Sequence, residues 1–242
     1  MLLLIDADIP CYRAAAACQE EIMWEPDVWS LYTDVGKAKL KFEAMIEKFQ
    51  EDTGMDEIKL CFTGPDNFRL GVYPEYKGNR VSRKPVGYGA LKEWAKEIYP
   101  FFEKPQLEAD DCMGILATKF KGKTAILTMD KDLKTIPGKL WHLNQKLEGK
   151  WIEVSEKEAD EWFLMQSLMG DVTDGFPGCP GIGPVSAKKL LETKGATWDT
   201  VKHAYIKAGL TEEDALQQAR CARILRASDW DFEKNEVKLW TP

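Results

Sequence analysis

The chain has 242 residues, a net charge of -7 and a pI near 5.1, with the composition of an ordinary globular protein. Its length allows one large domain or a larger and a smaller one. Six scattered cysteines without a CxxC pair, and only two histidines, argue against a zinc site and a disulfide framework. The N-terminal apolar run ends at Asp6 and no later stretch reaches the ~20 apolar residues of a membrane span, so we expect a cytoplasmic protein without membrane contact.

In the first part of the chain, the apolar pattern predicts strands that alternate with helices. Residues 2–6 are predicted to form a buried strand, residues 36–54 an amphipathic helix that ends at a glycine, and residues 58–62 a second strand. A turn follows at 63–67. A Gly- and Pro-rich segment then leads into a helix near 90–102.

The second part continues the alternation and then changes character. A helix is predicted over about 108–120, a strand over 124–129, and a hairpin from 139–144 and 150–154. The helix over 155–170 begins with a capping box and ends at a glycine. After it come glycine and proline breaks and short helices, with one further short strand near the C-terminus.

Strands that alternate with helices predict an α/β fold with a mostly parallel central sheet flanked by helices, followed by a smaller helical region. We expect the sheet domain to cover residues 1–170 and the helical region to cover 171–242. In such sheets, ligands bind beyond the carboxyl ends of the strands. The site should therefore lie at that edge.

Acidic residues gather at the predicted edge. They come from five segments: Asp6 and Asp8, Asp66, Glu108 with Asp110 and Asp111, Asp130 with Asp132, and Asp171 with Asp174. Each group alone has an ordinary explanation as helix N-terminal acids, turn formers or N-caps. Together they would repel one another unless cations lay among them.

Carboxylates without histidine or thiolate favour Mg²⁺ or Mn²⁺ as those cations. Two such ions about 3.5 to 4 Å apart clamp the attacking and leaving oxygens of a phosphodiester displacement. The segment 69–92, which has six Lys or Arg and one Glu, supplies a phosphate-binding surface beside the acids. The start "LLIDAD" also fits phosphatases that use Asp6 as a nucleophile, but that scheme leaves the other acids and the basic segment without a role.

Five motifs, in this order, resemble the 5′ nuclease family. They are "LLIDAD" at 3–8, "FRLGVYPEYKGNR" at 68–80, "LEADDCMGILA" at 107–117, "TMDKDL" at 128–133 and "MGDVTDGFPGCPGIGPVSAKKLL" at 169–191. The family includes bacteriophage flap endonucleases, 5′-3′ exonucleases and the 5′ nuclease domain of bacterial DNA polymerase I. The resemblance covers most of the chain and implies a PIN-like nuclease core.

The resemblance also implies two metal sites. The first has Asp6, Glu108, Asp110 and Asp111, with Asp130 shared or close by; the second has Asp130, Asp132, Asp171 and Asp174. Lys77 and Arg80 match basic residues beside the scissile phosphate, so these two and Asp6 are the expected catalytic residues. Thr63 stands where the family usually has an acid, which leaves open whether Asp66 is a ligand, and Asp8 is open in the same way.

Two segments are expected to hold DNA. Residues 76–100 match the family's basic arch, and 81–96 match its helical part, in which we expect the Gly- and Pro-interrupted stretch 81–91 to be mobile without DNA. Residues 178–190 resemble a helix-hairpin-helix element, which commonly grips the duplex around a K⁺ ion, and exposed amides at such a helix start bind phosphate. The expected DNA contacts are Arg69, Tyr76 (by stacking on a terminal base), Lys77, Arg80, Arg83, Lys84, Gly181, Gly183, Lys188 and Lys189.

The predicted function is a metal-dependent 5′ nuclease that hydrolyses DNA with 5′-3′ polarity, as an exonuclease, a flap endonuclease or both. The expected substrate is DNA with a free 5′ end, at a duplex end, nick, gap or flap. We expect a monomer that works in phage DNA replication or recombination in the host cytoplasm. The alternatives are a DNA-junction binding protein without catalysis, and the phosphatase with Asp6 as nucleophile.

Overall fold

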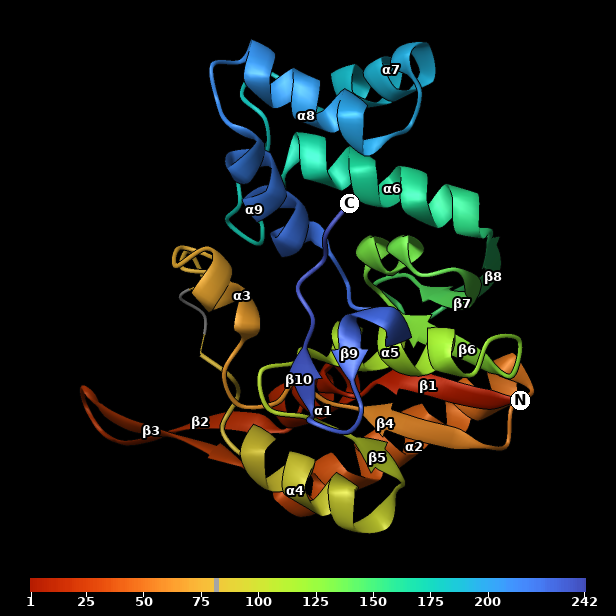
Figure 1. Cartoon of the computed structure of the whole chain (residues 1–242). Coiled ribbons are helices and arrows are strands. Elements are labelled where there is room, and N and C mark those ends of the chain that lie inside the picture. The colour runs from red at the N-terminus through yellow and green to blue at the C-terminus, as the bar shows by residue number, and fades with distance from the viewer. Residues whose placement is uncertain (81–82) are drawn as a thin grey trace.

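A six-stranded sheet lies at the centre of the computed structural model, which describes residues 1–80 and 83–242 (Figure 1). The strand order is β5-β4-β1-β6-β7-β8, and all neighbouring strands are parallel except β7 and β8. This confirms the predicted mostly parallel sheet. The strands are β1 (Leu2–Asp6), β4 (Ile58–Cys61), β5 (Phe101–Phe102), β6 (Thr124–Thr128), β7 (Gly138–Leu143) and β8 (Gly149–Val154).

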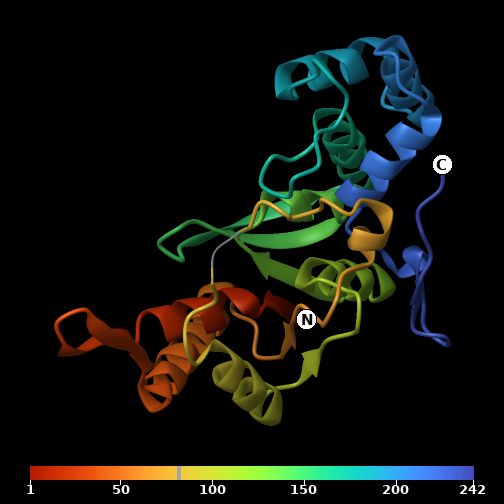
Figure 2. The same ribbon diagram turned by 90° about the vertical axis from the view of Figure 1, so that its left-hand side faces the viewer.

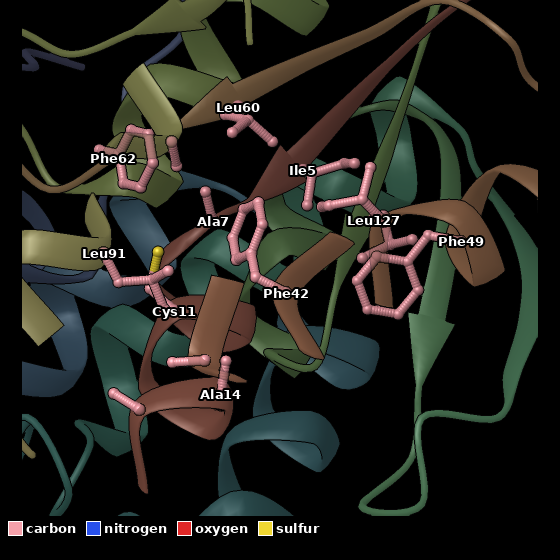
Figure 3. Packing of buried hydrophobic residues seen from close by; sticks show 14 of the residues in the cluster. Ile5, Ala7, Cys11, Ala14, Phe42, Phe49, Leu60, Phe62, Leu91 and Leu127 are labelled. Carbon is pink, nitrogen blue, oxygen red and sulfur yellow. The ribbon is translucent and has the colours of Figure 1, made fainter. Parts of the chain in front are cut away.

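Helices cover both faces of this sheet. Successive residues of β1 point to opposite faces, so each face presents apolar side chains to a different set of helices. Leu3 and Ile5 pack with α1 (Asp8–Ala16), α2 (Val35–Thr53) and α4 (Tyr88–Ile98), whereas Leu4 packs with α5 (Ala109–Lys119). Figure 3 shows the first of these clusters, which includes Ile5 of β1 and Phe42 of α2. The buried sheet is therefore a rigid base for whatever its strand ends carry.

A helical layer lies on the side of the sheet opposite α1, α2 and α4 (Figures 1 and 2). Its helices are α6 (Glu156–Met169), α7 (Pro184–Lys194), α8 (Trp198–Lys207) and α9 (Glu212–Ala222). Phe163 and Leu168 of α6 share a buried cluster with Leu191 and Tyr205. Packing thus places α6 with the helical layer, although we expected that region to start after residue 170.

The chain returns to the sheet after α9. A 3-10 helix, η2 (Ala227–Asp229), and two short strands, β9 (Trp230–Asp231) and β10 (Glu236–Val237), form this last segment. Leu225 and Trp230 lie in the same buried cluster as α5. The C-terminal segment therefore supports the helix that carries the "EADD" acids.

Local sequence signals set the ends of several helices where we predicted them. Ser155 caps α6 through a reciprocal pair of hydrogen bonds with Glu158, and α6 ends at Gly170. The helix α2 ends at Gly54, whose φ of 67° is the left-handed conformation that glycine adopts without strain. None of the helices within residues 1–80 and 83–242 has the length and apolar character that crossing a membrane requires.

A protruding hairpin of β2 (Gln19–Glu25) and β3 (Val28–Thr33) was not predicted, and neither was α1 (Figure 1). Both faces of the hairpin meet solvent, so its strands do not alternate apolar and polar residues. Met23, Trp24 and Trp29 are 75, 67 and 58 % exposed. At the base of the hairpin the Gln19 side chain accepts a hydrogen bond from the Val86 backbone at 2.9 Å.

The arch segment is more regular than we expected. Within 81–96, α4 begins at Tyr88, and its buried Tyr88, Leu91 and Ala95 fix it against the core. The expected mobility at 81–82 falls outside the described residues. A short helix, α3 (Phe68–Val72), precedes the "YKGNR" motif.

Candidate active site

Acidic side chains meet at the carboxyl edge of the sheet, as the parallel topology requires. Asp6 ends β1, and Asp130 caps a 3-10 helix, η1 (Lys131–Thr135), directly after β6. Glu108 caps α5, and Asp110 lies in the first turn of that helix. Glu108, Asp110 and Asp130 border a cavity of about 20 Å³, enough for a single water-sized occupant, whose lining also includes Asp132, Asp174 and Gln166. Two wider hollows lie elsewhere: one is lined by residues at the starts of β1, β4 and β7, and the other by residues of α6 and α7.

Glu108 is the acid most strongly held by cations. Its carboxylate contacts the Lys77 ammonium, accepts a hydrogen bond from the Tyr76 hydroxyl at 3.0 Å, and lies 3.2 Å from Arg69 Nη1. Burial opposes its ionisation, but Arg69 and Lys77 outweigh burial and lower the pKa of Glu108 to about 2. Glu108 is therefore ionised at any physiological pH.

Arg69 does not contact solvent, which corrects our expectation that it binds DNA. It is 2 % exposed, and its guanidinium pairs with both oxygens of Asp111 at 2.7 and 2.8 Å. It also donates to the backbone carbonyls of Cys221 and Arg223 at 3.0 and 2.6 Å. Arg69 thus ties α3, α5 and the end of α9 together.

The same contacts give Asp111 a structural role. Besides Arg69, its carboxylate accepts hydrogen bonds from the Glu108 and Leu225 amides, each at 3.1 Å, and it is fully buried. With both oxygens engaged, Asp111 orients the acid-bearing start of α5. We therefore leave it out of the metal ligands proposed below.

Tyr76 is also buried, contrary to our expectation that it stacks on a DNA base. It is 4 % exposed, and its ring lies nearly parallel to that of Phe176. Its hydroxyl is within hydrogen-bond distance of Glu108 at 3.0 Å and of Asp174 at 2.9 Å. Burial raises the pKa of Tyr76 far above its usual value, so the hydroxyl stays protonated and bridges two groups of acids.

The "YKGNR" motif places its cations against Asp174. Arg80 donates to one Asp174 oxygen at 2.6 Å, and Lys77 Nζ lies 3.6 Å from the other. The Lys77 backbone is left-handed, with a φ of 55°, and its amide donates to the Asp174 carbonyl at 2.7 Å. The loop after α6 therefore fixes the position of Lys77, which we expect to be catalytic.

Three acids of this site have an oxygen without a partner. Within residues 1–80 and 83–242, Oδ1 of Asp6, of Asp110 and of Asp132 is buried and makes no hydrogen bond. Burial and the charges of Asp8 and Asp130 raise the pKa of Asp6, and burial with Asp130 and Asp6 does the same for Asp110. Burial and Asp130 raise the pKa of Asp132 to about 7.

Orphaned carboxylate oxygens of this kind fit hard divalent cations. No group of three acidic, histidine or cysteine side chains in the described part of the chain is arranged to hold an ion by itself. Mg²⁺, however, usually keeps several waters and uses only one or two carboxylates. The donor set and its unmet charge therefore suit such an ion.

The remaining acids lie farther out. Asp66 is exposed in the turn before α3, with a left-handed φ of 63°, and the structure records no contact between it and the other acids in the described residues. Asp171 accepts the Thr173 and Asp174 amides at 2.7 and 3.2 Å and lies 3.7 Å from Lys131. The cavity thus gathers part of the predicted set, with Asp66 outside it.

Asp8 and Thr63 support the start of α5. Asp8 accepts hydrogen bonds from the Tyr88 hydroxyl at 2.6 Å and the Thr63 amide at 3.2 Å. Thr63 Oγ1 in turn accepts from the Ala109 amide at 3.1 Å, which satisfies one of the free N–H groups at the helix start. Threonine accepts this hydrogen bond without adding a negative charge beside the other acids, whereas an acid at position 63 would add one.

Comparison with known proteins identifies the family. The model described as "5′-3′ exonuclease, N-terminal resolvase-like domain" matches residues 1–158. The exodeoxyribonuclease of Enterobacteria phage T3 and the exonuclease of Escherichia phage T7 are each 32 % identical to this chain, over 100 % of it and 93 % of the relative. This chain belongs to the 5′-3′ exonuclease family. The resemblance found in the sequence motifs is confirmed.

The fold of this exonuclease family member is shared with a bacteriophage protein of known structure. The T5 D15 protein co-crystallised with metal ions matches with a TM-score of 0.67, covering 92 % of this chain and 89 % of that one. At 16 % identity, this likeness concerns the fold. It confirms the α/β core followed by a helical region.

The expected DNA contacts outside the cavity are exposed in the exonuclease fold. Arg83 and Lys84 lie on the surface beside α4, and Lys188 and Lys189 lie on the surface of α7. Gly181 has a φ of 75° with open space around it, and Gly183 caps α7 without a side-chain partner. Their contact with DNA remains a prediction.

Sequence reasoning missed Gln166, a polar residue at a buried position of α6. Gln166 follows Ala159 by seven residues and Phe163 by three, and all three are buried. This spacing puts it on the apolar stripe of the helix, where a polar residue is unusual. That mismatch was the available signal.

The metal-free exonuclease is expected to lose stability as pH rises. Asp132, with its pKa near 7 against 3.8, binds a proton more tightly in the folded chain, so its contribution is present at low pH and lost between about pH 4 and 7. Glu108 acts oppositely, but only below pH 4.5, where its contribution is lost on acidification. In EDTA, Tm should therefore be lower at pH 7.5 than at pH 5, and Asp132→Asn should flatten this difference. An unchanged or higher Tm at pH 7.5 would contradict it.

Proposed function

We propose that this 5′-3′ exonuclease family member hydrolyses DNA phosphodiester bonds from a free 5′ end with two divalent metal ions. The observation that carries the proposal is the set of buried oxygens of Asp6, Asp110 and Asp132 that have no partner among the described residues, together with Lys77 and Arg80, which Glu108 and Asp174 hold. A hydrolytic site that works without metal ions would not require several buried carboxylates with unpaired oxygens. The proposed ligands are Asp6, Glu108, Asp110 and Asp130 for one ion, and Asp130, Asp132, Asp171 and Asp174 for the other.

Mg²⁺ or Mn²⁺ bound there would lower the pKa of a coordinated water and stabilise charge on the phosphate. The chain's own cations complete this chemistry. Lys77 is held by Glu108 and Asp174, and Arg80 by Asp174, so both are positioned before DNA arrives. A substrate phosphate that enters beside them competes with these carboxylates and receives their hydrogen bonds, which neutralises the charge that develops during the reaction.

We further propose that the DNA runs over the exposed basic side chains of the protein. Arg83 and Lys84 follow directly from the "YKGNR" motif, so they continue its positive charge along the arch at 76–100. The start of α7, with Gly181, Gly183, Lys188 and Lys189, would bind the duplex backbone as a helix-hairpin-helix element, with K⁺ near the two glycines. All these groups come from one chain, so a monomer in the host cytoplasm would suffice for a role in phage DNA replication or recombination.

Product analysis tests the proposal. Flap, nicked and blunt duplexes labelled at the 5′ end are incubated with Mg²⁺, with EDTA as the control. Released mononucleotides would assign exonuclease activity, and a released intact flap would assign endonuclease activity. Binding of a junction without cleavage would instead favour the non-catalytic alternative. Hydrolysis of p-nitrophenyl phosphate without DNA cleavage would favour the Asp6 phosphatase.

Lys77→Met is expected to lower kcat by about 10²- to 10³-fold, the usual loss when one positioned donor to a developing charge is removed. Methionine has a side chain of similar length to that of lysine but cannot donate a hydrogen bond to the phosphate. Single-turnover cleavage of the preferred substrate measures this effect. Lys157→Met, on the exposed surface of α6, should cut like the wild type. Equal rates for the wild type and Lys77→Met would remove Lys77 from the mechanism.

A further inference from the structure

Gln166 presents an unsatisfied oxygen to the cavity of acids. It is 1 % exposed, it lines the cavity, and its Oε1 has no hydrogen-bond partner among the described residues. A buried amide oxygen without a partner is destabilising, so a folded chain rarely keeps one without a ligand for it. The helix α6 that carries it packs on η1, which carries Asp132.

The other buried glutamine of the helical layer shows what a structural role looks like. Gln218 is 5 % exposed, and its Oε1 accepts the Gly178 amide at 2.9 Å. Gln166 Oε1 has no such backbone donor. Its place in the chain is therefore not explained by the packing of the helices.

The surroundings of Gln166 decide what it can bind. Asp130, Asp132 and Asp174 line the same cavity, and ionised carboxylates only accept hydrogen bonds. When these acids are ionised, an amide oxygen in the same cavity can share with them a cation or a donor such as water. The amide oxygen of glutamine is a hard ligand of divalent cations, and the volume of about 20 Å³ admits one water.

We propose that Gln166 Oε1 accepts a hydrogen bond from a water of the divalent cation held by Asp130 and Asp132. This rests on the proposed two-metal function. Gln166 is then a positioning residue: it fixes the hydration shell of one ion from the helical layer, without adding negative charge to a crowded site. Groups that orient metal ligands in this way typically change metal affinity by about 10- to 100-fold when removed.

Titration calorimetry of Mn²⁺ into the full-length chain without DNA tests the proposal. Gln166→Met conserves the volume and removes the oxygen, so one of the two Mn²⁺ ions should bind about 10- to 100-fold more weakly while the other keeps its Kd. Gln218→Met is the matched control: it should lower Tm and leave both Kd values unchanged. Wild-type Kd values for both ions in Gln166→Met would overturn the proposal.

A second variant keeps the test decisive if Gln166→Met does not fold. Gln166→Glu retains an oxygen acceptor and adds charge, so Mn²⁺ should bind at least as tightly as in the wild type at pH 7.5, and its binding should raise Tm more. Weaker binding in Gln166→Glu would contradict the role. A wild-type chain that binds no Mn²⁺ would overturn the two-metal function itself. If the wild type binds two ions and Gln166→Met binds both with the same Kd values, only the role of Gln166 is overturned.

Discussion

Asp130→Asn is expected to reduce cleavage of a 5′-labelled flap by about 10³-fold or more while duplex binding persists. Asp130 acts on acids of both proposed groups of metal ligands. Its charge raises the pKa of Asp6, of Asp110 and of Asp132, which belong to both groups of proposed ligands. Asparagine keeps the shape of the side chain but removes the charge that both ions would share, so chemistry is lost before folding or DNA contact is.

Single-turnover cleavage in Mg²⁺ and fluorescence anisotropy of the duplex in Ca²⁺ measure the two effects separately. Asp66→Asn is the informative companion. Asp66 lies in an exposed turn with a left-handed backbone that asparagine also tolerates, so we expect a wild-type rate. A strong loss in Asp66→Asn would return Asp66 to the ligands, whereas an active Asp130→Asn would remove the metal assignment at η1.

Arg69→Met is expected to lower the free energy of unfolding by about 3 to 5 kcal/mol, as when one partner of a buried ion pair is removed. The change leaves the Asp111 carboxylate buried with only amide donors, and it leaves the Cys221 and Arg223 carbonyls without their donor. Burial and Asp111 act in opposite directions here: burial alone would lower the pKa of Arg69, and Asp111 reverses this. Urea unfolding followed by circular dichroism measures the loss.

The double variant Arg69→Met with Asp111→Leu separates stability from function. It removes both charges, so much of the stability should return. Cleavage should stay low, because Glu108 loses both the Arg69 contact and the capping partner that orient it. Arg83→Met, at the exposed arch, should unfold like the wild type. A double variant that cuts at the wild-type rate would show that the ion pair does not position Glu108.

The edge of the sheet at which the acids meet could be predicted from the sequence because parallel topology imposes it. Strands that end in acids must bring those acids to one edge, and Asp6 and Asp130 follow this rule. The fates of Arg69 and Tyr76 could not be predicted in this way. A basic or aromatic residue in a motif looks the same whether it meets DNA or a buried acid, and the partners of Arg69 come from positions 111, 221 and 223.

Two further features lay beyond the reach of periodicity. The β2–β3 hairpin has apolar residues on both exposed faces, so it shows neither the helical nor the strand period. Gln166 does sit on a helical period, but its polarity counted against burial. In both places, the sequence departs from the pattern of a packed element, and only the three-dimensional neighbours explain why.

The cluster around Arg69 has a consequence for the order in which the chain is made. Leu225, whose amide holds Asp111, follows Asp111 by 114 residues. At about 5 to 20 residues per second, the ribosome synthesises the end of α9 about 6 to 23 s after the start of α5. Until then the guanidinium of Arg69 lacks its carbonyl acceptors, and Glu108 lacks a fixed support. Nascent chains, and chains broken off during translation, would therefore carry the acids of a nuclease without being able to cut.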